Sequence, residues 1–347
     1  MNYTIIKKLP KVESLLQAFP LTHTACIKIA EDRKEVKDIL AGNDKRLLII
    51  VGPCSAWPKE AVFEYAKRLA KVNEKVKKTL KIVMRVYIQK PRTTKGWTGP
   101  VNQPDVFANP DIEKGVRYTR EMMIKVIEIG LPIADEALFT HNAKGFLELL
   151  SWVAIGARSA EDQEHRIFAS ALDCAVGLKN PTHGSLAIGV NGVIAAQYPH
   201  VAVFDGDEVQ THGNLYAHLV LRGANGQPNY DIASLEEVHK HMQKHKIKNS
   251  SVIIDASHDN CLKNGKKDYH LQPKIVFDTL QNLKSRSELH QLVKGFMLES
   301  FIKEGNQVVQ TDKPSALDLS GLSITDPCLG WDSTEDFLLK LAKEREF

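Results

Sequence analysis

Residues 81–94 of the 347-residue chain, KIVMRVYIQKPRTT, combine an apolar pattern with a cluster of groups that bind anions. The run 82–87 predicts a strand, and Pro91 predicts a turn after it, because proline donates no hydrogen bond to a sheet. The polar groups of interest are Arg85, Lys90, Arg92 and Thr93. Guanidinium, ammonium and hydroxyl groups together bind phosphate or carboxylate, although a solvated basic loop explains this stretch alone equally well.

Further cations follow other predicted strands, and their number favours a functional site. The full set is Arg85, Lys90, Arg92, Arg158, Lys179 and Arg222. These cations would repel one another if they met at one site with no anion between them. We therefore expect substrates that carry several negative charges, in the form of phosphate groups.

A second group of reactive residues also follows predicted strands. It consists of Cys54, His258, Glu299 and Asp326. One thiolate, one imidazole and two carboxylates suit one divalent metal ion of borderline softness, namely manganese, iron, cobalt or zinc. Each residue alone has an ordinary structural interpretation, but together at strand ends they predict a metal site. A metal beside these cations suggests activation of a carbonyl group on a phosphorylated sugar.

The elements that must position these residues alternate along the chain. Short apolar strands are predicted at 47–52, 81–87, 132–138, 151–157, 174–179, 200–205, 251–257 and 293–300. Helical patterns lie between most of them, so the sequence predicts an α/β fold, a closed (β/α)8 TIM barrel. The active site of such a barrel lies at the carboxyl ends of its strands. A doubly wound open sheet is the alternative, but no GxGxxG fingerprint follows the first strand.

Two regions depart from this alternation. Residues 1–45 are a polar, partly helical N-terminal extension that we expect to serve assembly or regulation, and residues 46–347 form the catalytic barrel. After the sixth predicted strand, residues 206–221 look like an inserted β-hairpin.

The composition argues against several classes of function. A net charge of +4 is too small to indicate nucleic acid as a partner, and the longest apolar runs are too short to cross a membrane. The N-terminus lacks the pattern of a signal peptide. Five cysteines without a pairing pattern are typical of a reduced, cytoplasmic protein.

Eight motifs along the chain resemble those of one enzyme family. They are GPCS (52–55), MRVYIQKPRTTKGW (84–97), AIGARSAEDQEHR (154–166), GLKNPTHGS (177–185), LRG (221–223), DASH (255–258), LES (298–300) and SITDPCLGW (323–331). Together they resemble 3-deoxy-D-arabino-heptulosonate 7-phosphate (DAHP) synthases of the type I alpha class. The resemblance covers nearly the whole chain.

This resemblance implies the first reaction of the shikimate pathway to the aromatic amino acids. Phosphoenolpyruvate condenses with erythrose 4-phosphate, water adds, and inorganic phosphate leaves. The implied metal ligands are Cys54, His258, Glu299 and Asp326. The implied phosphoenolpyruvate ligands are Arg85, Lys90, Arg158, Lys179, Arg222 and the backbone amide of Ala157. The implied erythrose 4-phosphate ligands are Pro91, Arg92 and Thr93.

Two proton transfers need candidates in this reaction. Lys90 is the candidate donor to the new alkoxide, since we expect a lysine among cations to have a lowered proton affinity. Glu136 or a water molecule on the metal would serve the addition of water, and the sequence leaves both open. The catalytic set is thus Lys90, Cys54, His258 and Glu136.

The resemblance also implies a homodimer or homotetramer and an aromatic amino acid as a possible effector. The N-terminal segment and the hairpin are shorter than in feedback-regulated members, which leaves the inhibition and its specificity open. A related synthase that uses arabinose 5-phosphate is a second interpretation, which the KPRTT motif disfavours. A barrel that only senses aromatic amino acids is a third, but such a protein would be expected to lack a ligand or a cation.

Overall fold

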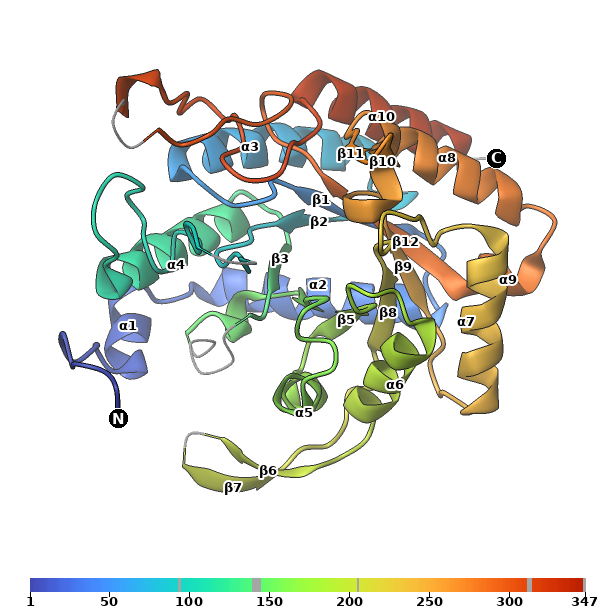
Figure 1. Ribbon diagram of the computed structural model, residues 1–347, viewed down its shortest axis with the longest axis horizontal. Coiled ribbons are helices and arrows are strands. Elements are labelled where there is room, and N and C mark those ends of the chain that lie inside the picture. Colours follow the sequence, from blue (N-terminus) through green and yellow to red (C-terminus); the bar gives the residue numbers. More distant parts are fainter. Residues whose placement is uncertain (93–94, 139–144, 205, 311–313, 346–347) are drawn as a thin grey trace.

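Eight parallel strands form a closed barrel in the computed structural model, which describes residues 1–92, 95–138, 145–204, 206–310 and 314–345. The strands are β1 (Leu47–Gly52), β2 (Leu80–Arg85), β3 (Ile133–Glu136), β4 (Trp152–Ile155), β5 (Ala175–Lys179), β8 (Ala217–Leu221), β9 (Val252–Asp255) and β12 (Val293–Glu299). The first strand pairs with β2 on one side and with β12 on the other, which closes the sheet (Figure 1). The predicted (β/α)8 barrel is confirmed.

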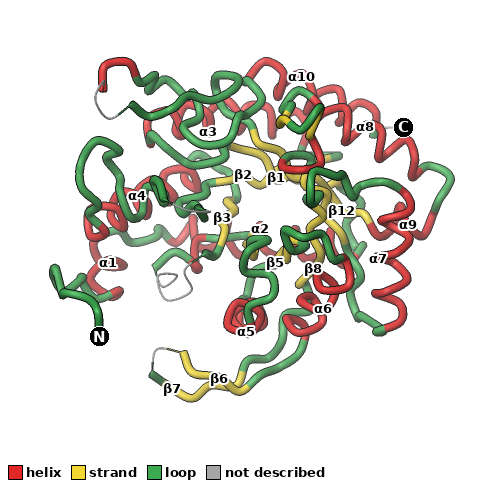
Figure 2. Tube along the Cα trace, in the orientation of Figure 1, coloured by secondary structure: helices red, strands yellow, loops and turns green. Residues whose placement is uncertain are grey.

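Helices surround the barrel, as the tube in Figure 2 shows. They are α3 (Lys59–Val76), α4 (Ile112–Glu128), α5 (Gln163–Ala171), α6 (Leu186–Gln197), α7 (Ile232–Lys244), α8 (Leu271–Leu283), α9 (Ser287–Leu292) and α10 (Trp331–Glu344). In α3, residues Ala61, Tyr65, Leu69 and Val72 recur at helical spacing and are buried. Such apolar faces pack on the strands and form the outer layer of the core.

The N-terminal extension contributes α1 (Val12–Ala18) and α2 (His23–Ala41). The last turns of α2 place Val36, Ile39 and Leu40 in one buried cluster with side chains from the barrel interior. Lys81 at the start of β2 forms an ion pair with Asp32 of α2, with 2.6 Å between the charged atoms. The second helix therefore covers the amino-terminal end of the barrel and leaves the carboxyl end for ligands. Its role in assembly or regulation stays a prediction.

The sixth barrel strand is not the one that the apolar pattern indicated. Residues 201–204 form β6 (Val201–Phe204), which pairs with β7 (Asp207–Gln210) in an antiparallel hairpin outside the barrel. Val201 and Val203 are 69% and 72% exposed, whereas every residue of β8 is buried. The prediction of 200–205 as the sixth strand and of 206–221 as a hairpin after it was therefore wrong. The hairpin spans residues 201–210 and precedes the sixth barrel strand, β8. The polar residue His218 interrupts the apolar run of β8, so the hydrophobic pattern did not indicate a barrel strand there.

The remaining elements are short. They are η2 (Leu147–Leu149), η3 (His258–Cys261), η4 (Pro314–Ala316), β10 (Leu262–Lys263) and β11 (Lys266–Lys267). The last two pair as a small hairpin that follows β9. None of the helices in the described ranges is both long enough and apolar enough to span a bilayer.

Candidate active site

The carboxyl ends of the strands bring the predicted residues to one end of the barrel. Arg85, Glu136, Lys179 and Glu299 are the last residues of four strands, and Cys54 lies two residues beyond β1. Others lie in the loops that follow their strands, namely Ala157 and Arg158 after β4, Arg222 after β8 and His258 after β9. In a parallel barrel these ends converge, which is why residues far apart in sequence can share one site.

A cavity of about 330 Å³ opens at this end of the barrel. The predicted residues that line it are Lys90, Pro91, Arg92, Glu136, Ala157, Arg158, Lys179, Arg222, His258 and Asp326. Arg85, Cys54 and Glu299 are fully buried and do not line the cavity. Thr93 lies outside the described residues.

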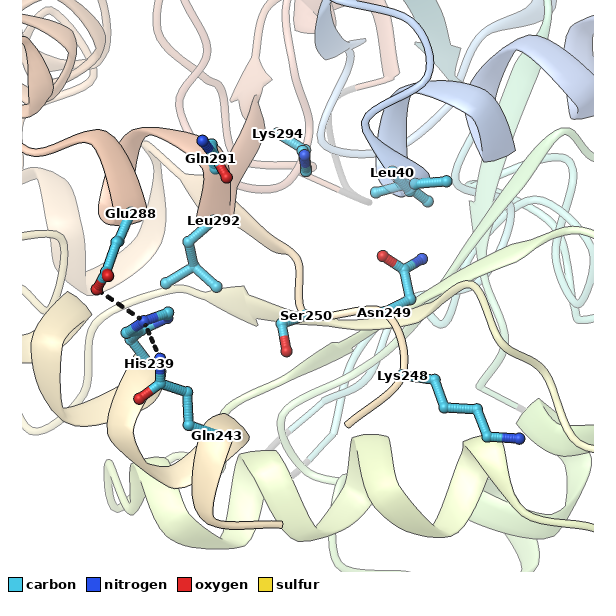
Figure 3. Close-up of a pocket in the computed structure, with 11 residues that line it drawn as sticks. Leu40, His239, Gln243, Lys248, Asn249, Ser250, Glu288, Gln291, Leu292 and Lys294 are labelled. Carbon is cyan, nitrogen blue, oxygen red and sulfur yellow. Dashed lines mark hydrogen bonds and ion pairs between the residues drawn. The ribbon is translucent and has the colours of Figure 1, made fainter. Parts of the chain in front are cut away.

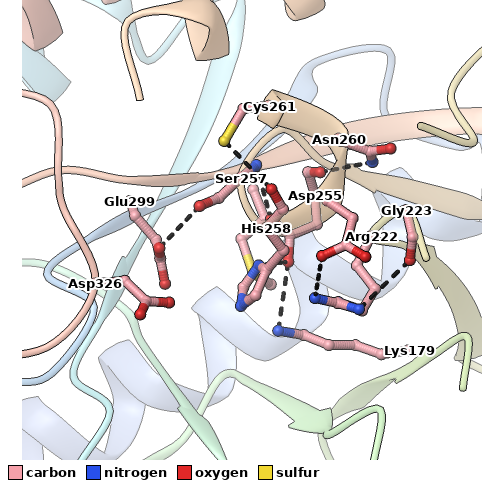
Figure 4. Close-up of polar contacts among 12 residues, drawn as sticks. Lys179, Arg222, Gly223, Asp255, Ser257, His258, Asn260, Cys261, Glu299 and Asp326 are labelled. Atoms are coloured by element: carbon pink, nitrogen blue, oxygen red, sulfur yellow. Dashed lines mark hydrogen bonds and ion pairs between the residues drawn. The ribbon is translucent and has the colours of Figure 1, made fainter. Parts of the chain in front are cut away.

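Three of the four predicted metal ligands lie together. The candidate ligand atoms of Cys54, Glu299 and Asp326 are all within 4.8 Å of one another. His258 is not part of this group, and its Nδ1 faces Asp255 at 2.9 Å. In the view of Figure 4, its imidazole lies between the two carboxylates of the group and the cations of the cavity.

The donor set fits a divalent metal ion. A thiol and two carboxylates, with an imidazole beside them, supply the mixture of sulfur, oxygen and nitrogen that borderline metals prefer. A cation already lies against these oxygen atoms, because Nζ of Lys267 is 2.5 Å from Glu299 and 3.3 Å from Asp326. Burial would raise the pKa of Glu299, but Lys267 and Arg85 hold it well below its usual value.

The imidazole of His258 is positioned by its backbone and by a buried carboxylate. The residue has a φ of 53°, in the left-handed region that is uncommon for a side chain of this size. Its partner Asp255 also faces Nζ of Lys179 at 3.3 Å. Burial would raise the pKa of Asp255, but His258 and Lys179 hold it well below its usual value. One carboxylate therefore joins the imidazole to the cations of the cavity.

The environment of Lys90 differs from the one expected. Its Nζ donates to the backbone oxygen of Cys54 at 2.8 Å and lies 3.1 Å from Sγ. Burial acts to lower the pKa of Lys90, but Cys54, Glu299 and Asp326 outweigh burial, so the pKa is raised. The expectation that neighbouring cations lower it was wrong, because the side chain turns toward the thiol and the carboxylates.

Arg85 is held beneath the cavity by several contacts. Its Nη2 donates to Glu299 at 3.0 Å, and its guanidinium lies 4.0 Å from the ring centre of Tyr87. Its Nη1 is buried and has no hydrogen-bond partner among the residues that the structure describes. A buried donor without a partner is costly, but Arg85 does not line the cavity, so its predicted contact with phosphoenolpyruvate stays a prediction. Arg222 pairs with Asp259 at 3.2 Å.

Lys267 was missed by the sequence analysis. It lies on β11, which follows the turn at Asn264 and Gly265. Both turn residues have positive φ, 53° and 73°, as a two-residue hairpin turn of type I′ requires. The Asn-Gly pair between lysines was therefore a usable signal for a hairpin, although nothing in the sequence showed that its second strand points into the site.

The fold and the site define a TIM-barrel protein with a cavity lined by cations above a group of potential metal ligands. The model of the DAHP synthetase I family matches residues 22–339, and the chain belongs to this family. It is 39% identical to "Phospho-2-dehydro-3-deoxyheptonate aldolase, Phe-sensitive" of Escherichia coli, over 97% of this chain and 94% of the relative. The Tyr-sensitive protein of the same organism is 38% identical, over 96% and 92%.

A solved structure agrees with this assignment. Phospho-2-dehydro-3-deoxyheptonate aldolase from Francisella tularensis superposes with a TM-score of 0.91 at 35% sequence identity. The match covers 99% of each chain.

Proposed function

We propose that this protein is a DAHP synthase, which condenses phosphoenolpyruvate with erythrose 4-phosphate and releases inorganic phosphate. The observation that carries the proposal is the cavity at the carboxyl end of the barrel, where cations line the wall and Cys54, Glu299 and Asp326 lie together. Two phosphorylated substrates need such a set of cations, and an aldehyde needs an electrophilic group beside them. Family membership and the names of the relatives support the same reaction.

Cys54, His258, Glu299 and Asp326 would hold one divalent ion of manganese, iron, cobalt or zinc. The ion would supply Lewis acidity to a carbonyl oxygen. Figure 4 shows the imidazole of His258 on the same side of the site as the carboxylates of Glu299 and Asp326, next to Asp255.

The residues of the chain would divide the work of binding and proton transfer. Arg158, Lys179 and Arg222 would hold the carboxylate and phosphate of phosphoenolpyruvate, and the loop at Pro91 and Arg92 would hold the phosphate of the sugar. Lys90 would donate a proton to the new alkoxide. Its raised pKa keeps it protonated before the reaction, as a donor must be.

Glu136 remains a candidate for activating the water that adds. It lines the same cavity as Lys90 and the cations. A carboxylate at this place could accept the proton of a water molecule held beside the substrate.

Further properties are proposed on the same basis. Two relatives are named Tyr-sensitive and Phe-sensitive, and we therefore propose an aromatic amino acid as the effector. We propose a homodimer or homotetramer. The five cysteines are free, which supports a cytoplasmic location.

The decisive experiment follows the enol absorbance of phosphoenolpyruvate. Metal-stripped protein is mixed with phosphoenolpyruvate and erythrose 4-phosphate, and manganese is added partway. We expect consumption only after the addition. Folded protein that shows no turnover with any of the four metals would reject the proposal, and turnover with arabinose 5-phosphate alone would support the related synthase instead.

A further inference from the structure

A second cavity, of about 580 Å³, lies at the opposite, amino-terminal end of the barrel. It is enclosed by the end of α2, the loop into β1, the end of α8, α9, the start of β12 and Arg345 after α10. Lys294 lines it from the second position of β12, whereas Glu299 ends the same strand at the candidate active site. Five residues of strand separate the two by about 17 Å, so the two cavities are distinct.

Cations gather at this cavity. Those that line it are Lys45, Arg46, Lys294 and Arg345, together with His290. Burial alone acts on Lys294 and lowers its pKa, and burial also lowers the pKa of Arg345. The pKa of His290 is lowered first by burial and then by Arg345 and Lys294, which places these three groups within range of one another.

The negative charge at the cavity does not balance these cations. Asp44 is the one acidic residue among the lining residues in the described part of the chain. Both of its oxygen atoms are already used by Arg46, which donates its backbone N–H at 2.9 Å and its Nη2 at 2.6 Å. No ion pair or hydrogen bond joins the ammonium of Lys294 to a carboxylate within the described ranges. An anion is the group that this arrangement would stabilise.

The carbonyl groups of nearby helix ends are the alternative explanation for the cations. Both α2 and α10 end at this cavity, and helix C-termini favour positive charge. Arg345 follows that pattern in part, since it donates to the backbone oxygen of Lys45 at 3.4 Å. Lys294 also lies at the end of α2, because its Nζ is 3.2 Å from the place that a Cβ on the capping residue Gly42 would take, but it donates no hydrogen bond to a carbonyl oxygen within the described ranges.

The wall of the cavity is apolar on one side. Leu280 and Leu283 of α8 line it together with Leu47 and Val293 from the start of two barrel strands. A ligand with both an anionic group and an apolar body would therefore match the surface better than a free inorganic anion.

A smaller depression of about 340 Å³ adjoins this cavity and shares Ala41, Gln291 and Lys294 with it. Figure 3 shows the side chains of Gln291 and Lys294 above Ser250 and Asn249. The Nδ2 donor of Asn249 is buried and has no partner among the described residues. A donor without a partner thus lines the depression to which Lys294 also belongs, and it favours an acceptor such as a carboxylate.

We propose that the cavity at the amino-terminal end of the barrel binds a small organic acid, with its carboxylate among Lys294, His290 and Arg345 and its apolar body on Leu280 and Leu283. An α-amino acid fits less well, because its ammonium group would meet the cations without a free carboxylate to pair with. The site would therefore bind a carboxylic acid more tightly than the amino acid of the same shape. This inference does not depend on the proposed catalytic function.

Isothermal titration calorimetry with two matched probes tests the proposal. 3-Phenylpropionate and L-phenylalanine differ only in the ammonium group. On the full-length protein, with phosphoenolpyruvate in excess to occupy the active site, we expect 3-phenylpropionate to bind at least tenfold more tightly at this site. Lys294→Met should weaken that binding at least tenfold, whereas Lys284→Met, an exposed lysine outside the cavity, should not change it.

Two results would overturn the proposal, namely no binding of 3-phenylpropionate and binding that Lys294→Met leaves unchanged. Turnover of the Lys294→Met protein is measured in parallel, and we expect it to equal that of the unaltered protein. Loss of probe binding with full turnover would show that this site is separate from the catalytic one. If the protein is inactive but still binds the probe, the proposed function fails and the proposed binding site does not.

Discussion

Side chains at the candidate active site lie in two layers. At the base, Glu299 is buried beside Cys54 and is paired with Arg85 and Lys267. In the layer above, Arg158 and Arg222 line the cavity. Lys90 connects the layers, because it lines the cavity and contacts the thiol.

Replacing Lys90 by alanine should lower turnover about 10²- to 10⁴-fold, the range associated with loss of a positioned acid. Folding should change far less, because the side chain is only partly buried. Steady-state kinetics and urea unfolding measure the two effects. Lys95→Ala, an exposed lysine of the same loop, is the matched control. Turnover that survives Lys90→Ala would remove the assigned role.

Lys267 shares two carboxylates with the predicted metal site, so the ammonium and the metal compete for the same oxygen atoms. We expect Lys267→Met to tighten manganese binding at least tenfold in a calorimetric titration. The metal-stripped variant should unfold more easily, by about 3 kcal/mol, because Glu299 loses a buried partner. Lys266→Met, exposed on the same hairpin, should leave both quantities unchanged. Weaker metal binding in Lys267→Met would contradict competition.

At the scale of elements, β4 and β8 are joined inside the barrel by Trp152 and His218. Nε1 of Trp152 donates to Nε2 of His218 at 3.1 Å, and Nδ1–H of His218 donates to the backbone oxygen of Tyr216 at 2.8 Å. The contact with Trp152 needs the neutral ring, because only an unprotonated Nε2 can accept a hydrogen bond. Burial lowers the pKa of His218 to about 4, although the contact with Tyr216 acts in the opposite direction.

Acid should therefore weaken the barrel through His218. Below a pH of about 6.5, His218 binds a proton in the unfolded chain but not in the folded chain. The neutral ring contributes about 3 kcal/mol to the free energy of unfolding above that pH, and this contribution is lost as the pH falls toward 4. Urea unfolding between pH 7 and 4.5 measures it. His218→Gln should lack this part of the pH dependence, whereas exposed His245→Gln should keep it. Equal slopes in His218→Gln and the unaltered protein would contradict the argument.

Strand ends were the most informative feature of the sequence. They predicted most of the cavity, because a parallel barrel sends every carboxyl end to one place. Pairwise contacts were not predictable in the same way. The hydrophobic pattern favoured the exposed strand β6 over β8, since it could not recognise His218 as a buried neutral group. Whether the pKa of Lys90 is raised or lowered depends on which neighbours its side chain faces. The spacing of residues along the chain does not contain that information.

At the scale of the whole molecule, the hairpin of β6 and β7 projects from the barrel (Figure 1). Val201, Val203 and Tyr198 expose 69%, 72% and 63% of their surface there. Exposed apolar residues on a protruding hairpin are suited to contact with a second copy of the chain.

A lysine at Val203 should weaken assembly. Desolvating an added charge at an interface is unfavourable, so we expect the proposed dimer or tetramer to dissociate at lower dilution than the assembly of the unaltered protein. Sedimentation velocity measures this. Glu208→Lys, at the cross-strand partner of Val203, adds a positive charge without removing apolar surface and should have a smaller effect. An unchanged sedimentation coefficient in Val203→Lys would exclude the hairpin from the interface.

The barrel can close only after its last strand has been synthesised, because the first strand pairs with the last. Leu48 is paired with Gly295, so about 250 residues must leave the ribosome before β1 finds its second neighbour. At roughly 5 to 20 residues per second, translation of that interval takes about 10 to 50 seconds. For all of that time one edge of a fully apolar strand is open to other nascent chains. Slower translation of the last hundred codons would lengthen this exposure, so the yield of folded protein should depend on codon choice far from the first strand.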